Sequence, residues 1–385
     1  MRIALVHDYI KEYGGAERVL EALHEMYPNA PVFTLVYCPE FLGPHRKRFE
    51  NWNIKTSPLN DIPFKEKFIS MYRLIAPWAF QLFNFAGYDV IIVSATGAYS
   101  PNTIRKKSAQ QICYCHTPPR YLYGYATARE WKKHPLVRVV AEWANTWLRK
   151  VDKNASKHVD VFIANSEEVK ARIKKFYQRD AVVVYPPVED SSLSFLRKQE
   201  SRKGTGSRIK SGMTDDYYLA GGRLARPKHF DLIIRTANEQ QLPLKIFGKG
   251  FAGYGEELRA MAGPTVEFLG EVTDEEKREY MEHAKAFIMA SEDEDFGITP
   301  VEAMGVGTPV IAYKSGGLKE TVVDGKTGIF FDELSVAGIV GALKKLEALR
   351  LRSGKKLAED CVKRAEQFDT KHFVDGIQKV LAAFS

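Results

Sequence analysis

Short apolar runs alternate with amphipathic stretches along the first half of the chain. RIALVHDY is followed by AERVLEALHEMY, and later apolar runs are PVFTLVY, DVIIVSA, QQICYCHT, DVFIANS and AVVVYPP. Short runs rich in β-branched and aromatic residues predict buried strands, whereas apolar positions three and four residues apart predict amphipathic helices. This alternation predicts a mostly parallel sheet that is covered by helices.

The same alternation begins again after Pro186-Pro187, with the apolar runs YYLAGGRL, LKIFGKG, VEFLG, KAFIMAS and TPVIAY. The restart predicts two Rossmann-like, doubly wound α/β domains, residues 1–190 and 214–370, which face each other across a cleft. Residues 191–213 are basic, contain Ser and Gly and lack periodicity, so they are interpreted as a linker or insertion without chemistry. Residues 371–385 are expected to form a C-terminal helix, and one alternative is that this helix packs against the N-terminal domain.

Composition narrows the class of protein. The hydrophobic content of 45% in 385 residues is enough for two cores and excludes global disorder. Four cysteines make no disulfide framework, and the chain shows neither a signal peptide nor ~18 consecutive apolar residues. We therefore expect a cytoplasmic protein, either free or peripheral at the inner face of the cell membrane.

The net charge of +8 is unevenly distributed. Basic residues outnumber acidic ones in residues 1–190, and the reverse holds in residues 214–385. No nucleic-acid recognition motif accompanies the basic half, so nucleic acid is not expected as a partner. A phosphate-bearing substrate and an anionic membrane surface remain as partners for the basic charge.

Glycines and cations follow several of the predicted strands. Gly14 and Gly15 separate the first strand from its helix, where backbone amides can bind an anion. GGRLARPKHF places Arg223 and Lys228 after the first strand of the second domain, a pair suited to a diphosphate. FGKGFAGYG follows the next strand and suggests that a nucleotide approaches Gly248 and Lys249; because it is not the first strand of its domain, NAD binding is not expected.

Carboxylates surround a predicted helix start in SEDEDFGITPVEAMGVG, residues 291–307. The helix is predicted to begin at Thr299-Pro300, and Glu302 either closes a capping box with Thr299 or binds a ligand. Asp293 and Asp295 have the spacing of a metal-binding carboxylate pair, but the two cations after the first strand would make a metal redundant. Backbone groups at the helix start are expected to contact the nucleotide, namely those of Phe296, Gly297, Ile298 and Thr299.

CYCH, residues 113–116, suggests metal binding, but no second ligand pair occurs at zinc spacing. Cys113 and Cys115 share one face of a strand and are expected in the core. His116 stands at the carboxyl end of that strand, where ligands bind in parallel sheets. We therefore interpret His116 as a candidate site residue and expect no metal.

Together these segments resemble the retaining glycosyltransferases of family 4, which have the GT-B fold. Glu294 and Glu302 match the family's two glutamates with seven residues between them, and GGRLARPK, VVVYPPV and SGGLKETVVDGKTGIF match as well. The resemblance covers nearly the whole chain apart from residues 191–213. Among the subgroups, CHTPPRYLYGY is most similar to WbaZ-type mannosyltransferases of polysaccharide and O-antigen assembly.

The resemblance implies a role for each candidate residue. Glu294 would bind hydroxyls of the donor sugar, and Glu302 would bind the ribose hydroxyls of the nucleotide. Arg223 and Lys228 would hold the diphosphate and stabilise the leaving-group charge without a metal or other cofactor. His116 would contact the sugar ring near the reacting carbon.

The implied reaction transfers a hexose, mannose from GDP-mannose, onto a lipid-linked glycan or oligosaccharide with retention of configuration. UDP-glucose and UDP-N-acetylglucosamine are alternative donors for the same chemistry. A non-catalytic nucleotide-sugar-binding protein is an alternative of a different class, but it would be expected to lack Arg223, Lys228 or Glu294.

Two segments of the basic half mix Trp, Phe and Leu with Lys and Arg. They are FKEKFISMYRLIAPWAFQLFNF, residues 64–85, and WKKHPLVRVVAEWANTWLRK, residues 131–150. A basic amphipathic helix either packs onto the protein's own sheet or lies in an anionic membrane interface. We expect at least one of the two segments to be interfacial, which agrees with a lipid-linked acceptor.

Overall fold

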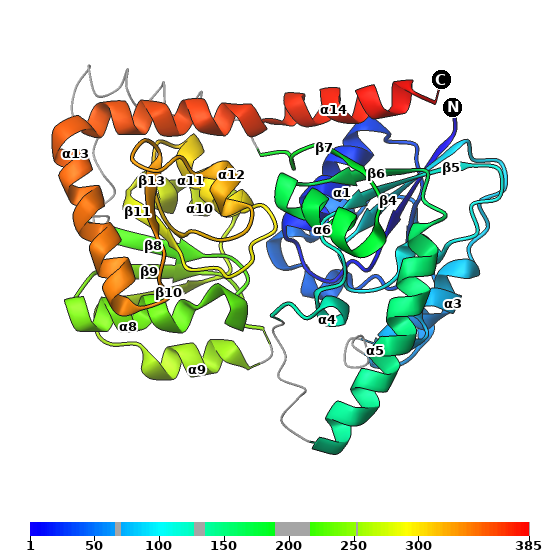
Figure 1. The fold of residues 1–385 in the computed structure, drawn as a ribbon, viewed down its shortest axis with the longest axis horizontal. Coiled ribbons are helices and arrows are strands. Elements are labelled where there is room, and N and C mark those ends of the chain that lie inside the picture. The colour runs from blue at the N-terminus through cyan, green and yellow to red at the C-terminus, as the bar shows by residue number, and fades with distance from the viewer. Residues whose placement is uncertain (66–70, 127–134, 189–215, 252, 385) are drawn as a thin grey trace. The chain divides into compact units, whose positions relative to one another are not determined.

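The chain forms two compact units in a computed structural model, which describes residues 1–65, 71–126, 135–188, 216–251 and 253–384 (Figure 1). The N-terminal unit comprises Met1–Pro187 together with Phe373–Ser385, and the C-terminal unit comprises Val188–His372. Each unit is built on a parallel sheet with helices around it, which confirms the predicted pair of Rossmann-like α/β domains. Residues 191–213, the expected linker or insertion, lie outside the described residues.

The N-terminal unit contains seven parallel strands in its described part. In spatial order they are β3 (Ile54–Thr56), β2 (Val32–Thr34), β1 (Ile3–His7), β4 (Val90–Ala95), β5 (Gln110–Cys115), β6 (Val161–Ala164) and β7 (Ala181–Val183). The direction of winding reverses between β1 and β4, and ligands of open α/β sheets bind beyond the carboxyl ends of the strands at such a point.

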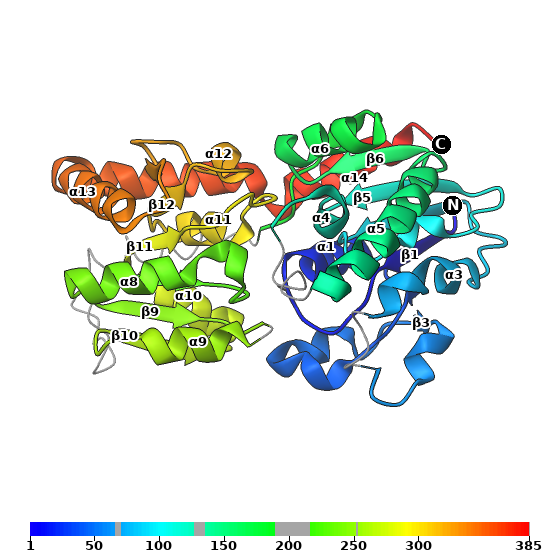
Figure 2. The same ribbon diagram turned by 60° about the horizontal axis from the view of Figure 1, so that its bottom comes forward.

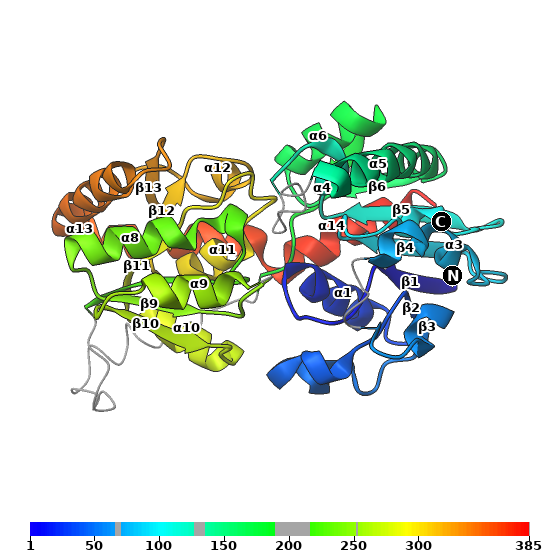
Figure 3. The same cartoon turned by 90° about the horizontal axis from the view of Figure 1, so that it is seen from below.

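Helices surround this sheet in both turned views (Figures 2 and 3). They are α1 (Gly15–Met26), α3 (Ala76–Gln81), α4 (Arg120–Tyr123), α5 (Pro135–Ser156), α6 (Glu167–Tyr177) and α14 (Thr370–Ala382). Short 3-10 segments lie between them: η1 (Pro39–Phe41), η2 (Gly43–Phe49), η3 (Pro58–Asp61), η4 (Met71–Leu74) and η5 (Pro101–Thr103). No helix among the described residues is long and apolar enough to cross a bilayer.

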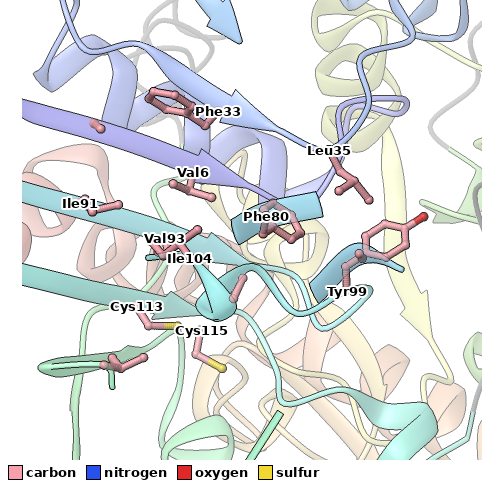
Figure 4. Packing of buried hydrophobic residues seen from close by; sticks show 14 of the residues in the cluster. Val6, Phe33, Leu35, Phe80, Ile91, Val93, Tyr99, Ile104, Cys113 and Cys115 are labelled. Atoms are coloured by element: carbon pink, nitrogen blue, oxygen red, sulfur yellow. The ribbon is translucent and has the colours of Figure 1, made fainter. Parts of the chain in front are cut away.

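Alternate residues of the strands supply two cores, one on each face of the sheet. Val6 and Val93 point into the cluster shown in Figure 4, whereas their neighbours Leu5 and Ile92 belong to the opposite cluster. Burying a side chain of this size contributes about 1.5–3 kcal/mol. Cys113 and Cys115 lie together in the first cluster, so the expected core placement of the two cysteines is confirmed.

The C-terminal helix α14 completes the second of these cores. Phe373 is buried against Tyr114, with ring centroids 5.9 Å apart, and Ile377 is buried in the same cluster. Gly376 lies so close to Val184 that a Cβ atom on it would approach the Val184 side chain to 2.8 Å. Residues distant in sequence therefore close one face of the N-terminal sheet.

The C-terminal unit contains six parallel strands in its described part. Their spatial order is β10 (Val266–Gly270), β9 (Leu244–Phe247), β8 (Tyr217–Gly221), β11 (Ala284–Met289), β12 (Val310–Tyr313) and β13 (Gly328–Phe331). The winding reverses between β8 and β11, so the ligand edge expected for this sheet lies beyond the carboxyl ends of these two strands.

Helices cover both faces of the second sheet, with α8 and α9 on one side and α10 and α11 on the other (Figure 1). The helical segments are η7 (Arg226–Lys228), α8 (Phe230–Gln240), α9 (Tyr254–Met261), α10 (Asp274–Glu282), α11 (Ile298–Gly305), α12 (Leu318–Thr321), α13 (Val336–Ala365) and η8 (Glu366–Phe368). Helix α13 contains a kink at Ser353.

Candidate active site

Loops at the carboxyl edge of the C-terminal sheet are joined by backbone hydrogen bonds. The amide of Glu292, in the loop after β11, donates to the carbonyl of Pro227 at 2.8 Å. The amide of Gly317, in the loop after β12, donates to the carbonyl of Glu294 at 2.7 Å. The loops after β8, β11 and β12 therefore form one framework, which carries most of the predicted donor-binding residues.

Two glycines allow these loops to approach one another closely. Gly248 has a φ of +123°, and a Cβ atom there would lie 1.8 Å from the carbonyl oxygen of Gly222. Gly316 has a φ of +54°, and a Cβ atom there would lie 2.2 Å from the carbonyl oxygen of Glu294. Only glycine fits at either position, so Gly248 acts here by letting two backbones touch.

The Glu294 carboxylate is fixed by neighbours on both sides. Its Oε2 accepts a hydrogen bond from the Ser291 hydroxyl at 2.5 Å and lies 3.4 Å from the Lys228 ammonium. The side chains of Glu294 and Lys228 are 17% and 21% exposed, so solvent screens this pair less than a surface pair. Among the described residues nothing is bonded to the other oxygen, Oε1, which is left to accept a hydrogen bond from a ligand.

The second predicted cation, Arg223, is exposed and lies in the loop that follows β8. Its guanidinium group lies 5.5 Å from the centroid of the Phe251 ring. Lys228 closes the 3-10 turn η7 in the same loop, and the next residue, His229, faces Glu292 at 3.5 Å. One loop thus supplies a planar guanidinium cation and a compact ammonium cation.

Helix α11 begins one residue earlier than predicted, at Ile298, with Gly297 at its N-cap in a left-handed conformation. The alternative in which Thr299 and Glu302 close a capping box is therefore wrong, because Gly297, with a positive φ, is the N-cap and no side chain caps the helix. Phe296 is buried and packs edge-on against Phe368, with ring centroids 5.3 Å apart. Its side chain belongs to the core, so only its backbone is left for a ligand.

Glu302 instead pairs with a lysine from the neighbouring helix α10. The Lys277 ammonium lies 2.8 Å from Glu302 and 2.9 Å from Asp274, and the Lys277 and Glu302 side chains are each 13% exposed. A small pocket beside this pair is also lined by Arg278 and Met281. The structure thus places Glu302 in a charged hollow between α10 and α11.

Lys249 is half-exposed and pairs with Glu271 at 3.1 Å. A surface pair of this kind contributes little to stability, so Lys249 can exchange partners at low cost.

Asp293 is held by its backbone, whose amide donates to the Ser315 hydroxyl at 3.0 Å. Within the described ranges, no three His, Cys, Asp or Glu side chains cluster as they would around a metal ion.

In the N-terminal unit, Gly14 is the N-cap of α1 and Gly15 is its first helical residue. The Gly14 amide donates to the Glu17 carboxylate at 2.9 Å. His116 follows β5, and its Nε2 lies 2.9 Å from the hydroxyl of Ser94 on β4. The same hydroxyl lies 3.0 Å from Nδ1 of His7, at the end of β1.

Burial is the largest cause of the pKa shifts of His116 and Asp8 at this edge of the N-terminal sheet. It lowers the pKa of His116 to about 3, helped by the nearby His7, so the imidazole is neutral near pH 7. Burial also raises the pKa of Asp8, although hydrogen bonds from Thr96 oppose the shift. One Asp8 oxygen accepts from the Thr96 hydroxyl at 2.6 Å, and the other has no partner among the described residues.

Several residues at these edges were not predicted. Ser94 was visible as a polar residue inside an apolar strand, and Glu17 as an acid three positions after the glycine turn. Gly316 and Gly317 repeat the double glycine that marks the first loop of the chain. Lys277 carried no signal, because it is one of many charges in DEEKREYMEHA.

Both units match known families. Residues 13–192 match the family model described as Glycosyltransferase Family 4, and residues 207–368 match the one described as Glycosyl transferases group 1. The alpha-1,3/1,6-mannosyltransferase ALG2 of Dictyostelium discoideum is 24% identical over 345 residues, which cover 80% of this chain and 79% of the relative.

The D-inositol 3-phosphate glycosyltransferase of Nocardioides sp. is 28% identical over 245 residues, which cover 55% of this chain and 51% of the relative. The chain spans about half the length of the curated D-inositol 3-phosphate glycosyltransferases that it matches.

Solved structures show the same fold. HepE of Anabaena, in complex with UDP, matches with a TM-score of 0.67 and 19% identity, covering 100% of both chains. The sucrose-phosphate synthase of Thermosynechococcus elongatus matches with a TM-score of 0.72 and 18% identity, again over 100% of both chains. The two family models, each of which matches less than half of the chain, together support a glycosyltransferase of family 4 with the GT-B fold.

Proposed function

We propose that the protein is a retaining glycosyltransferase that moves mannose from GDP-mannose onto a lipid-linked glycan in polysaccharide or O-antigen assembly. The observation that carries the proposal is the Lys228–Glu294 pair, set beside Arg223 and the start of α11 at the carboxyl edge of one sheet. Mannose is favoured by the match to a named mannosyltransferase over four-fifths of the chain. The similarity to WbaZ-type enzymes belongs to the same proposal.

Charge explains how this arrangement would act. As the glycosidic bond breaks, negative charge grows on the nucleoside diphosphate, and Arg223 and Lys228 stabilise it where they already stand. The amides of Ile298 and Thr299 open the N-terminus of α11 and add partial positive charge. Glu294 Oε1 accepts a hydrogen bond from a sugar hydroxyl, which places the reacting carbon.

An apolar surface on the N-terminal unit supports a membrane-bound acceptor. Trp78 on α3 and Trp143 on α5 are 55% and 79% exposed, and Trp78 stacks on Trp147 with ring centroids 5.1 Å apart. The described parts of the two segments singled out in the sequence meet at this stack, and their exposed apolar side chains are here called the apolar patch. Its exposed members are Leu74, Ile75, Trp78, Leu82, Val139, Val140 and Trp143.

Cations border the apolar patch. Arg105 and Lys107 are exposed and donate to Gln81 and Asn84 beside α3, at 3.2 Å and 3.1 Å. Exposed lysines continue along α5 and just after its end: Lys150, Lys153 and Lys157. Apolar side chains rimmed by cations match an interface of anionic lipid, where each basic residue contributes about 1 kcal/mol. The partner proposed for this face is therefore the anionic membrane surface that holds the acceptor.

A second donor class is favoured by one observation. HepE, which shares the fold, was solved with UDP-glucose, and Lys277 beside Glu302 could serve either nucleoside. The proposal therefore keeps UDP-glucose and UDP-N-acetylglucosamine as alternative donors. A non-catalytic nucleotide-sugar-binding protein is disfavoured, because Arg223, Lys228 and Glu294 are all present.

A panel of nucleotide-sugars tests the proposal. GDP-mannose at 100 times its Kd should stabilise the folded chain by about 2.7 kcal/mol, seen as a rise in melting temperature. Incubation with that donor and a polyprenyl-diphosphate-linked sugar should then give a product with the α-configuration of the donor, as read by NMR. Stabilisation by UDP-sugars alone would show that the donor is a UDP-sugar and not GDP-mannose. A product with inverted configuration would overturn the retaining assignment.

A further inference from the structure

A buried chain of hydrogen bonds connects the glycine turn before α1 with His116. Glu17 accepts the Gly14 amide through Oε2, and its Oε1 lies 3.4 Å from Nε2 of His7. Ser94 then bridges Nδ1 of His7 and Nε2 of His116, at 3.0 Å and 2.9 Å. Each of these four residues is at most 8% exposed, so water does not compete for their hydrogen bonds.

When each imidazole carries one proton, only one assignment of donors and acceptors satisfies this series of hydrogen bonds. The Glu17 carboxylate only accepts, so His7 must donate from Nε2 and accept at Nδ1. The Ser94 hydroxyl therefore donates to His7, and its oxygen accepts from Nε2–H of His116. His116 is left with an unprotonated Nδ1, which has no partner among the described residues.

We propose that Glu17, His7 and Ser94 form a relay that fixes His116 in the Nε2–H tautomer, so that its Nδ1 accepts a hydrogen bond from a hydroxyl of the bound sugar. The part that concerns the sugar rests on the proposed function; the relay itself does not. Glu17, His7 and Ser94 are positioning residues, because they act on the ligand only through His116. His116 stays neutral near pH 7, so its tautomer decides what it offers to a ligand.

The variant Glu17→Gln tests the relay at a distance. The Gly14 amide is a fixed donor at 2.9 Å, so the carbonyl oxygen of the introduced carboxamide should turn toward it and the NH2 group toward His7. His7 would then accept at Nε2 and donate from Nδ1 to Ser94. The Ser94 hydroxyl would donate to His116, which would carry its proton on Nδ1. An isosteric change three groups away should thus reverse the tautomer of His116.

Nitrogen-15 NMR of the full-length, ligand-free protein reads this directly. Spectra are recorded about two pH units above the ordinary histidine pKa of about 6.5, and His116→Gln identifies the resonances. We expect a protonated Nε2 in the wild type and a protonated Nδ1 in Glu17→Gln. Because the neutral side chain of free histidine already favours the Nε2–H form, the reversal is the decisive result. An unchanged tautomer in the folded variant, or a protonated Nδ1 in the wild type, would overturn the relay.

A matched control lies one turn along α1. Glu21 pairs with Arg48 at 2.8 Å and takes no part in the relay, so Glu21→Gln should leave the His116 resonances unchanged. If Glu17→Gln lowers the yield of folded protein, Ser94→Ala serves in its place. Loss of the bridging hydroxyl should move both His116 nitrogens toward intermediate shifts, the sign of a mixture of tautomers; retained wild-type shifts would contradict the relay.

Donor analogues test the accepting role separately. Replacing one sugar hydroxyl at a time by hydrogen or fluorine removes the donor proton, and fluorine keeps only an acceptor. At the hydroxyl that meets His116, both replacements should lower kcat/KM by about tenfold to a hundredfold in the wild type. Neither should have that effect in His116→Ala. A fluoro analogue that retains full activity at this position would contradict an accepting Nδ1, whatever the NMR result.

Discussion

Lys228 lies 3.4 Å from Glu294 and shares the loop after β8 with Arg223. In the proposed reaction the two cations act on the charge that develops as the leaving group departs. We expect Arg223→Ala and Lys228→Ala each to lower kcat by about a hundredfold to a thousandfold, the usual loss for one such donor. Steady-state kinetics with GDP-mannose measure this.

The matched control for this prediction is Arg235→Ala on α8. Arg235 is 54% exposed and pairs with Asp231 within its own helix, so its removal should change kcat less than twofold. Turnover close to that of the wild type in both Arg223→Ala and Lys228→Ala would reject the diphosphate assignment.

Asp152 on α5 is a buried carboxyl group that makes stability depend on pH. It accepts a hydrogen bond from the Tyr123 hydroxyl at 2.8 Å, but burial raises its pKa to about 6 from an ordinary value of 3.8. The folded state therefore holds this proton more tightly than the unfolded state. The stability it contributes is complete below about pH 4 and is lost as the pH rises through about 6.

We therefore expect the free energy of unfolding of the wild type, relative to Asp152→Asn, to fall by roughly 2 kcal/mol between about pH 4 and about pH 6.5. Urea unfolding of both proteins at several pH values gives this difference. A difference that is constant or rises over that range would show that Asp152 is ionised without penalty in the folded chain.

The apolar patch combines exposed side chains of α3 and its flanking residues with those of α5. If the patch lies in an anionic interface, Trp78→Ser and Trp143→Ser should each weaken vesicle binding on the order of tenfold, because burying a large apolar side chain contributes about 1.5–3 kcal/mol. Co-sedimentation with anionic phospholipid vesicles measures this. High salt should weaken the binding, since it screens the bordering cations.

Leu351→Ser is the control for the apolar patch. Leu351 is 89% exposed on α13, in the other unit, so its removal lowers surface hydrophobicity without touching the patch. Vesicle binding that falls equally in Leu351→Ser and Trp143→Ser would indicate nonspecific adsorption. Equal recovery of the wild type with neutral and anionic vesicles would rule out the proposed partner.

At the scale of elements, the local pattern predicted the central strands but missed β3 and β13, and it was insufficient for the charged contacts. Apolar runs marked the central strands, because strands buried on both faces leave few polar positions. The start of α11 was misplaced, since the left-handed Gly297 overrides the capping signal of Thr299. The pairing of Lys277 with Glu302 and the stacking of Trp78 on Trp147 join separate helices, which periodicity does not record.

At the scale of the whole molecule, the proposed binding of the diphosphate by Arg223 and Lys228 leads us to expect metal-independent turnover. Activity should survive excess EDTA, and Asp295→Asn should keep measurable kcat, because Asp293 and Asp295 would then be loop residues only. A coupled assay before and after chelation measures this. Abolition by EDTA with recovery on addition of Mn²⁺ would show that the carboxylates hold a metal on the diphosphate.

The return of α14 to the N-terminal unit sets the order in which the protein can mature on the ribosome. Phe373 and Ile377 complete the core beside Tyr114, yet they are synthesised after the entire C-terminal unit. At translation rates of about 5–20 residues per second, that delay is roughly ten to forty seconds. During that time the nascent N-terminal unit exposes the part of this core that Phe373 and Ile377 later cover, and holding chaperones would act there.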